Sequence, residues 1–563
     1  MTSNTVSSLG DEYWQWVLRT EPTWSTYLAD PRYNDQLPRI GQADIDRQVA
    51  ELRDLRTRVD AVNPSGLGDD DRVSRGILLH LLNSQIEERE HKFHQWNVDQ
   101  MTGPQVWLLE LLNYHPFKIE KDVLDLIARF QSFPAHIDQH LANLRDGLAV
   151  GRVAPRIAVT RVVGQLEALL ATPPEKSPLA LALVKRPASA TSLDARLLAA
   201  IRDAVYPAYA KYLEFLKTEY GPKAREEVGV WATKGGEAAY AFRVRHHTTT
   251  DLTPDELHEI GHQELKSILG EMQEIARKLG HAGDVKSFFG KLMAEPANFW
   301  PTREEILRHF ERVLQKCTAA LPKAFGLLPK SACIVKAIED YREKDSVAAF
   351  YYQPPEDLSR PGIFYANTYK PETRPKCNNA ALTVHEAVPG HHLQIAISVE
   401  MKGLPAFRRH SSFTAFVEGW ALYSERLADE MGLYEADLER FGMLTYQAWR
   451  ACRLVVDTGL HAKRWTRRQA IDFFKANIAL GDTEIVNEVD RYIIWPGQAL
   501  TYKVGQREIS RLRAEAKKAM GSRFDLRGFH DTVLRHGALP LTTLGEIVRR
   551  WSEQPAVASP GPI

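Results

Sequence analysis

Cysteine is scarce in this sequence. Its 563 residues include only four cysteines, Cys317, Cys333, Cys377 and Cys452, and none of them forms a CxxC pair. Such wide spacing predicts neither a disulfide framework nor a zinc site built from thiolates. Any metal site must therefore use histidine and carboxylate ligands.

The sequence also lacks net charge and long hydrophobic runs. Its 72 Lys and Arg residues balance 72 Asp and Glu residues, so there is no basic excess for nucleic acid and no polybasic segment for an anionic membrane. No run approaches the roughly 20 apolar residues that span a bilayer, and residues 1–10 lack the features of a signal peptide. We therefore expect a cytoplasmic protein without nucleic-acid or membrane partners; the sequence does not indicate an oligomeric state.

Helical periodicity dominates what is present. Apolar residues recur at helical spacing over 44–59 and 192–218, and a capping box at Thr253 and Glu256 begins a helix predicted to reach about Leu279. Further helical patterns cover 381–399, 414–431, 438–463 and 467–479. The sequence therefore predicts a mainly α fold.

A short β element interrupts this pattern. Residues 347–352 and 363–369 are typical of two strands, which predicts an antiparallel hairpin, and the proline-rich segment 171–190 predicts a loop. For the whole chain we expect a helical scaffold over 1–240, a catalytic part over 241–551 in the same compact unit, and a disordered tail over 552–563.

Two histidine strings are candidate metal motifs. The first, HEIGH at 258–262, has the HExxH spacing that places two histidines on one face of a helix, with a glutamate that activates water. However, His258 and His262 flank the apolar stripe of a simple amphipathic helix, and no later helix offers an obvious third ligand. We therefore favour a structural role for this string.

The second string, HEAVPGHHLQ at 385–394, moves the next histidines away from HExxH spacing. On a straight helix His392 would lie about 10 Å beyond His385, and His391 would point about 120° away. The Pro-Gly pair permits a two-residue bulge, because proline cannot donate the helical hydrogen bond and glycine tolerates unusual dihedral angles. Such a bulge would return His391 to the position of the second HExxH histidine, although the choice between His391 and His392 stays open.

A carboxylate follows in a suitable place. Glu418 lies 27 residues after His391, in an apolar and aromatic helical segment where a solvated glutamate is unexpected. A metal ion would compensate the burial of its charge; the alternative is a surface glutamate beside a kink. Glu425, two turns further on, is either a partner of the metal ligands or a solvated residue, and we expect the latter.

Three motifs together resemble the DUF885 family, which is similar in fold to helical gluzincin-type zinc metallopeptidases. They are HExxPGHHxQ at 385–394, EGWALY at 418–423 and RYxxxPGQAxxYKxG at 491–505. The resemblance implies a mainly α fold with a deep central cleft, His385, His391 and Glu418 as ligands of one zinc ion, and Glu386 as general base. It also implies that the string at 258–262 is not the metal site.

Other residues are candidates for binding substrate. The hairpin edge at 361–367 can pair with an extended peptide, with Asn367 as an extra donor, or it is purely structural. Arg453, Asp457 and His461 form one polar line on a helix. Arg453 paired with Asp457 can hold a carboxylate and His461 can donate to a tetrahedral intermediate; the alternative is a structural ion-pair network.

A last group surrounds the Pro-Gly turn at 496–497. In the resembling peptidases a late tyrosine stabilises the oxyanion and a nearby basic residue holds a substrate carboxylate. The resemblance assigns these roles to Tyr502 and Arg491, with Gln498 as a further substrate contact; the alternative is a buried tyrosine and a surface arginine.

These features predict a zinc-dependent hydrolase of peptide or peptide-like amide bonds in small substrates. Glu386 activates water, and Tyr502 or His461 stabilises the oxyanion. Two alternatives remain: a metal-independent enzyme on an amino-acid derivative, with Glu386 and His392 as acid and base, and a peptide-binding protein without turnover.

Overall fold

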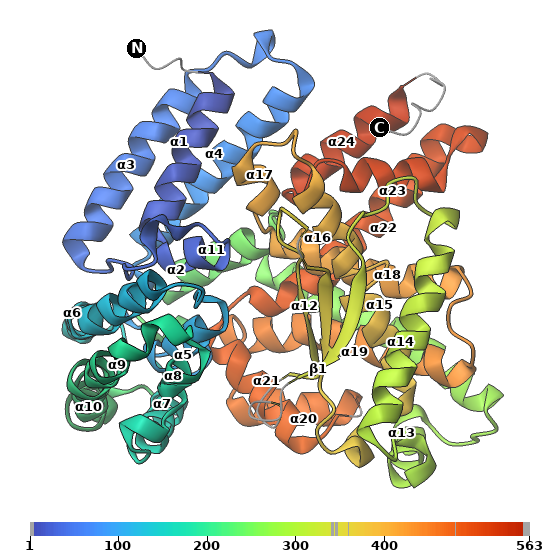
Figure 1. The fold of residues 1–563 in the computed structure, drawn as a ribbon. Helices are drawn as coiled ribbons and strands as arrows, with labels where there is room; N and C mark the ends of the chain where they lie inside the picture. The colour runs from blue at the N-terminus through green and yellow to red at the C-terminus, as the bar shows by residue number, and fades with distance from the viewer. Residues whose placement is uncertain (1–4, 339–342, 344–346, 359, 479, 555–563) are drawn as a thin grey trace. The chain divides into compact units, whose positions relative to one another are not determined.

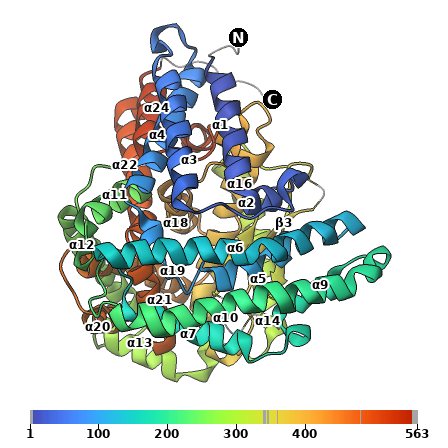
Figure 2. The ribbon, with the colours of Figure 1, turned by 90° about the vertical axis from the view of Figure 1, so that its left-hand side faces the viewer.

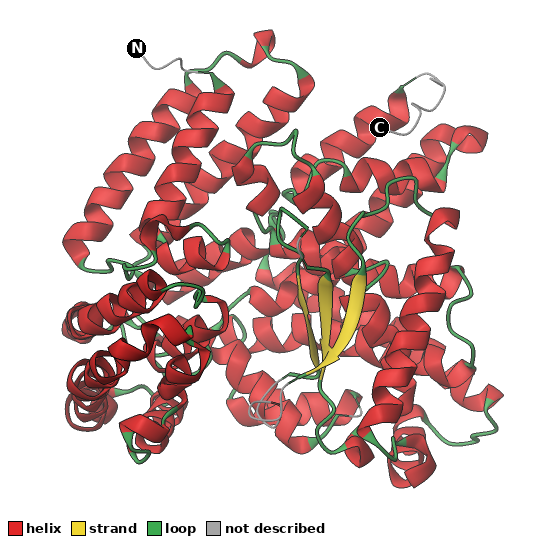
Figure 3. Ribbon diagram, in the orientation of Figure 1, coloured by secondary structure: helices red, strands yellow, loops and turns green. Residues whose placement is uncertain are grey.

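The computed structural model of the chain is mainly helical (Figure 3). It describes residues 5–338, 343, 347–358, 360–478 and 480–554. Within these ranges, no helix combines the length and the apolar character needed to cross a membrane. The predicted fold class, mainly α with a small β element, is confirmed.

The chain divides into two compact units, Met1–Ala239 and Tyr240–Ile563. The roles expected for the two parts of the chain stay predictions. Residues 552 and 553, which were expected in the tail over 552–563, belong to the last helix, and residues 555–563 lie outside the described part.

The first unit is a set of helices around an apolar core. Its helices are α1 (Val6–Thr20), α2 (Pro22–Tyr27), α3 (Gln42–Asp60), α4 (Asp69–Glu90), α5 (Pro104–Tyr114), α6 (Glu120–Val150), α7 (Arg156–Leu170), α8 (Leu181–Lys185), α9 (Asp194–Ala200) and α10 (Tyr206–Phe215). Helices α6 and α10 lie side by side (Figure 2), with the rings of Phe133 and Tyr209 in edge contact at 5.0 Å. Short helical turns, α8 among them, replace the loop expected over 171–190.

The second unit begins within α11 (Gly236–Thr248), because the boundary between the two units falls between Ala239 and Tyr240. Its helices are α12 (Pro254–Lys278), α13 (Val285–Ala294), α14 (Arg303–Ala320), α15 (Asn379–Glu386), α16 (His391–Glu400), α17 (Ala406–His410), α18 (Thr414–Glu430), α19 (Asp437–His461), α20 (Arg467–Asn477), α21 (Asp482–Ile494), α22 (Thr501–Met520), α23 (Leu526–Leu534) and α24 (Leu541–Glu553) (Figure 1). The predicted capping box is present, since Thr253 Oγ1 accepts from the amide of Glu256. Helix α19 is buried along most of its length.

The small sheet contains the predicted hairpin and one further strand. β2 (Ala349–Tyr352) pairs antiparallel with β3 (Gly362–Ala366), with Tyr352 opposite Ile363. The strand that was not predicted, β1 (Cys333–Ala337), pairs in parallel with β3. The order β1-β3-β2 makes β3 the central strand, so both of its edges are occupied.

Candidate metal centre

The second histidine string interrupts a helix. α15 ends at Glu386 and α16 begins at His391. Across the gap, the amide of Gly390 donates to the carbonyl of Val384 at 3.0 Å and so bridges six residues instead of the four of an α-helix. The predicted two-residue insertion is present, as a break between two helices rather than a bulge within one.

The geometry of this break depends on glycine and on α18. A Cβ atom on Gly390 would lie 2.1 Å from the carbonyl oxygen of His385, so no side chain fits there. Trp420 Nε1 and Ser424 Oγ both donate to the carbonyl of Pro389, at 2.8 and 3.1 Å. These bonds tie the break to the helix that carries the predicted carboxylate ligand.

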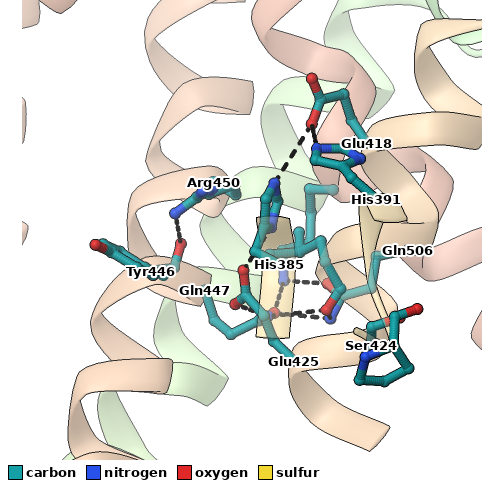
Figure 4. Close-up of polar contacts among 12 residues, drawn as sticks. His385, His391, Glu418, Ser424, Glu425, Tyr446, Gln447, Arg450 and Gln506 are labelled. Atoms are coloured by element: carbon teal, nitrogen blue, oxygen red, sulfur yellow. Dashed lines mark hydrogen bonds and ion pairs between the residues drawn. The ribbon is translucent and has the colours of Figure 1, made fainter. Parts of the chain in front are cut away.

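Three predicted ligands meet at one point (Figure 4). The Nε2 atoms of His385 and His391 both lie 3.5 Å from Oε2 of Glu418. Within the described ranges, this is the one group of three or more potential metal-ligating side chains whose ligand atoms all lie within 4.8 Å of one another. The structure therefore brings His391, and not His392, to His385 and Glu418.

The spacing fits a metal ion better than direct hydrogen bonds. A usual N–H···O distance is about 2.9 Å, whereas ligand atoms about 2.1 Å from a tetrahedral zinc ion lie about 3.4 Å from one another. Oε2 of Glu418 and Nδ1 of His391 are buried and have no hydrogen-bond partner among the described residues. Two imidazoles and a carboxylate are also a donor set of catalytic zinc sites, so these residues suit one zinc ion.

The histidines and carboxylates of the cluster shift one another's pKa values. Burial alone would lower the pKa of His385, but Glu418 and Glu425 outweigh burial and raise this pKa to about 9. Burial would raise the pKa of Glu418, yet His385 and His391 hold it well below its usual value. A metal ion held at Nε2 of His385 would therefore compete with a proton on this residue.

Glu425 holds the other ring nitrogen of His385. Its Oε1 lies 2.9 Å from His385 Nδ1, and its Oε2 accepts from Gln447 Nε2 at 2.9 Å. Lys503 Nζ donates to Oε1 of Gln447 at 2.8 Å, and burial lowers the pKa of Lys503 to about 8. Glu425 is fully buried, so the expectation that it is solvated is wrong.

The sequence partly indicated that Glu425 lies beside the metal cluster. Glu425 follows Glu418 by seven residues, two turns of α18, so both side chains share one face of that helix. Gln447 and Lys503 lie on α19 and α22, far away in the chain, and no local pattern marks them as partners of Glu425.

Glu386, the predicted general base, directly follows His385. Its side chain is largely buried, and it makes no hydrogen bond or ion pair with the described residues. Its carboxylate is thus free to act on a substrate.

His392 points away from the cluster. Its Nδ1 lies 2.9 Å from the hydroxyl of Tyr351 and its Nε2 lies 3.0 Å from the carbonyl of Ser331. Burial lowers its pKa to about 4. Both ring nitrogens are occupied by the sheet region, so the structure gives His392 an anchoring contact instead of the predicted catalytic position.

The polar line on α19 has other partners than predicted. Arg453 does not pair with Asp457; it donates to Tyr492 Oη at 2.9 Å and to Glu488 at 3.1 Å. Asp457 accepts from the hydroxyl of Tyr240 at 2.7 Å and from the amide of Gly497. These contacts support the alternative of a structural network.

His461 lies far from the cluster. It ends α19, 14 residues after Gln447, which corresponds to about 21 Å of helix. Its Nε2 lies 2.9 Å from the carbonyl of Tyr492. The predicted donation from His461 to an intermediate is therefore incompatible with its position.

Arg491 and Gln498 lie in the same network as Arg453. Arg491 donates to Glu488 at 2.9 Å and approaches Oε1 of Gln498 at 3.5 Å. Tyr502 packs its ring over Arg453, with 4.4 Å between the guanidinium carbon and the ring centre. Glu488 thus already binds Arg491, as it binds Arg453, and both arginines were expected to hold a substrate carboxylate.

Asn367 closes a loop. Its Nδ2 donates to the carbonyls of Glu343 and Val347, and its Oδ1 accepts from the amide of Tyr369. Because β3 is the central strand, peptide addition along 361–367 is excluded. Both observations correct the predicted substrate-binding role of this segment.

The HExxH string at 258–262 packs against α19. Gly261 leaves no room for a side chain, since a Cβ atom there would lie 2.7 Å from Val455. His258 Nδ1 lies 2.7 Å from Thr458 Oγ1, and His262 Nε2 lies 3.3 Å from His258 Nε2. These contacts agree with the structural role that we favoured.

Comparison with known proteins gives the family. A family model described as "Bacterial protein of unknown function (DUF885)" matches residues 22–548, so the chain belongs to the DUF885 family. No curated protein matches it in sequence.

Solved structures show the same fold. A Colwellia psychrerythraea protein, provisionally described as a lipoprotein, is 28% identical with a TM-score of 0.92, over 98% of this chain and 100% of its own. A Shewanella oneidensis protein, provisionally described as a lipoprotein of unknown function, is 18% identical with a TM-score of 0.77, over 97% and 100%. A Bacillus anthracis str. Ames protein, provisionally described as oligoendopeptidase F, reaches a TM-score of only 0.30 at 10% identity, over 90% and 96%, too low to show a shared fold.

The comparisons correct one expectation. The first two structures are described as lipoproteins, a class of membrane-anchored or exported proteins. This finding contradicts the expected cytoplasmic location.

Proposed function

We propose that this DUF885 protein is a metal-dependent hydrolase of peptide or peptide-like amide bonds in small substrates. The observation that carries the proposal is the buried cluster in which two histidine Nε2 atoms lie 3.5 Å from one oxygen of Glu418. His385, His391 and Glu418 would hold one zinc ion, which when bound lowers the pKa of water and polarises a carbonyl.

Glu386 is the proton carrier of this proposal. It lies next to His385 in the chain, and no described residue occupies its carboxylate by a hydrogen bond or ion pair. It accepts a proton from the attacking water and then delivers this proton to the leaving nitrogen. Breaking the amide bond requires both transfers, because a neutral amine leaves more easily than its anion.

Tyr502 remains the candidate oxyanion donor. Its ring is fixed by Arg453 and Arg450, at 4.4 and 5.7 Å, and its hydroxyl has no hydrogen-bond partner among the described residues. A hydroxyl held in this way can donate to a developing negative charge without first breaking another bond.

The metal-independent alternative is weaker. It requires His392 as acid or base, but Tyr351 and Ser331 occupy both ring nitrogens. Peptide binding without turnover remains a rival that only an assay separates from hydrolysis.

The test is turnover of a mixed library of dipeptides and N-acyl amino acids. We expect zinc-loaded protein to release free amino acids and chelator-treated protein to lose this activity until zinc is restored. Glu386→Gln should lower kcat by about 10²- to 10⁴-fold with zinc still bound, whereas Glu372→Gln, at an exposed glutamate, should not. No turnover by the zinc-loaded protein, or full activity of Glu386→Gln, would refute the proposal.

The two lipoprotein descriptions also support a location outside the cytoplasm or on a membrane. Fractionation of the native bacterial cells tests this point. We expect the protein in the membrane or exported fraction, and its recovery with cytoplasmic enzymes would contradict the expectation.

A further inference from the structure

Arg450 on α19 is a buried cation without a carboxylate partner. Its residue is 6% exposed, and its one hydrogen bond joins Nη1 to the carbonyl of Tyr446 at 3.5 Å. Nε is buried and has no partner, and no carboxylate within the described ranges forms an ion pair with this side chain. Arg453 and Arg491 differ, since both bind Glu488.

Aromatic rings hold the Arg450 guanidinium in place. Its central carbon lies 4.8 Å from the ring centres of Tyr446 and Trp449 and 5.7 Å from that of Tyr502. Rings of this kind attract the faces of a guanidinium but cannot supply a counter-charge. Nη2, which forms no hydrogen bond with the described residues and is not among the buried unpaired atoms, therefore stays available for a negatively charged group.

Arg450 lies one helical turn from a residue that supports the metal cluster. Gln447, one turn earlier on the same face of α19, donates to Glu425, which in turn holds His385. Figure 4 draws Arg450, Gln447 and His385 together in one close-up. A group bound to Arg450 would therefore belong to a molecule that also reaches the cluster.

We propose that Arg450 binds the terminal carboxylate of the substrate. The proposal rests on the proposed hydrolase function and names its substrate class: short peptides and N-acyl amino acids with a free carboxylate, cut near the carboxyl end. Arginine suits this role because its fork makes two parallel hydrogen bonds to a carboxylate. A carboxylate would also give this buried charge a direct partner, since Glu484 interacts with Arg450 only at longer range and forms no ion pair with it.

The test compares one tripeptide library prepared as free acids and as carboxyl-terminal amides. We expect wild-type protein to prefer the acids. Arg450→Gln should lose about 10- to 100-fold more kcat/KM on acids than on amides, so that the preference for acids disappears, while any loss through Tyr502 affects both libraries alike. Arg450→Lys should recover part of the loss, since it restores the charge but not the fork. Arg440→Gln, at a partly exposed arginine of α19 paired with Asp429, is the matched control.

A binding measurement tests the role of Arg450 independently of the proposed hydrolysis. Calorimetric titration of the Glu386→Gln protein with both libraries should show tighter binding of acids even if no turnover exists. Equal handling of acids and amides by wild-type protein would overturn the assignment of Arg450 whether or not the variants fold. An acid preference that Arg450→Gln retains would overturn it as well.

Discussion

His385 faces a carboxylate at each of its ring nitrogens, Glu418 at Nε2 and Glu425 at Nδ1. The first contact places the nitrogen lone pair where a metal can use it. The second fixes the ring and makes that nitrogen a better donor, as carboxylate partners do in zinc proteins.

This arrangement predicts the effect of Glu425→Gln. Zinc affinity should fall about 10- to 100-fold, because the amide cannot hold the ring as an anion does. Glu430→Gln on the same helix removes an exposed ion pair with Arg513 and should leave affinity unchanged. Competition with a chromophoric chelator measures both, and equal affinities of the two variants would contradict the role of Glu425.

The raised pKa of His385 predicts that zinc and protons compete. With a pKa of about 9 in the metal-free protein, His385 carries a proton at neutral pH. Zinc binding must release it, so the apparent affinity should rise about tenfold per pH unit up to about pH 9 and then level off. Titrations at pH 6.5, 7.5 and 8.5 check the slope, and an affinity independent of pH would contradict it.

At this scale the sequence predicted which residues form the cluster better than it predicted their hydrogen-bond partners. His385, His391 and Glu418 share motifs with a recognisable spacing, and the structure brings their ligand atoms together. The predictions of substrate contacts were wrong. Arg453 on α19 pairs with Glu488 on α21, and local spacing in the sequence does not show that these two helices meet.

Helices α18 and α22 meet through two glycines, and their contact determines where Glu418 lies. A Cβ atom on Gly505 would lie 1.8 Å from the carbonyl of Ala415, and one on Gly419 would lie 2.4 Å from the Cα of Gly505. Backbone atoms block both positions, so a side chain can be accommodated only by moving a helix.

Gly505→Ala should therefore destabilise the protein by about 1–3 kcal/mol or more and weaken zinc binding through Glu418. Gly545→Ala in α24 is the matched control, because the nearest atom to its Cβ would be 3.7 Å away. It should be neutral or stabilising, since alanine favours helix over glycine. Urea unfolding measures both, and equal stability of the two variants would contradict the close contact.

Elements with strong local signals were predictable. The capping box of α12 and the periodicity of α3, α18 and α19 correspond to helices. Strand β1 was missed because it pairs in parallel with β3, 29 positions further along the chain, without a turn that would mark the pair. The break between α15 and α16 was predictable from Pro389 and Gly390, but its form depends on bonds from α18.

For the whole molecule, composition predicted no nucleic-acid or membrane partner, which stays a prediction, and it did not show location. Balanced charge and few cysteines are compatible with proteins inside and outside the cytoplasm, so the expected cytoplasmic location had little physical basis. Two proteins of the same fold that are provisionally described as lipoproteins contradict it. Fold and family, in contrast, extend over nearly the full chain.

In the proposed function the irregular histidine string, and not the regular HExxH string, holds the catalytic metal. Zinc content after equilibrium dialysis tests it directly in wild-type protein, His391→Ala and His258→Ala. We expect about one zinc ion per chain, the stoichiometry of a catalytic site, in wild-type protein and His258→Ala, and far less in His391→Ala. Zinc retained by His391→Ala and lost from His258→Ala would contradict the account.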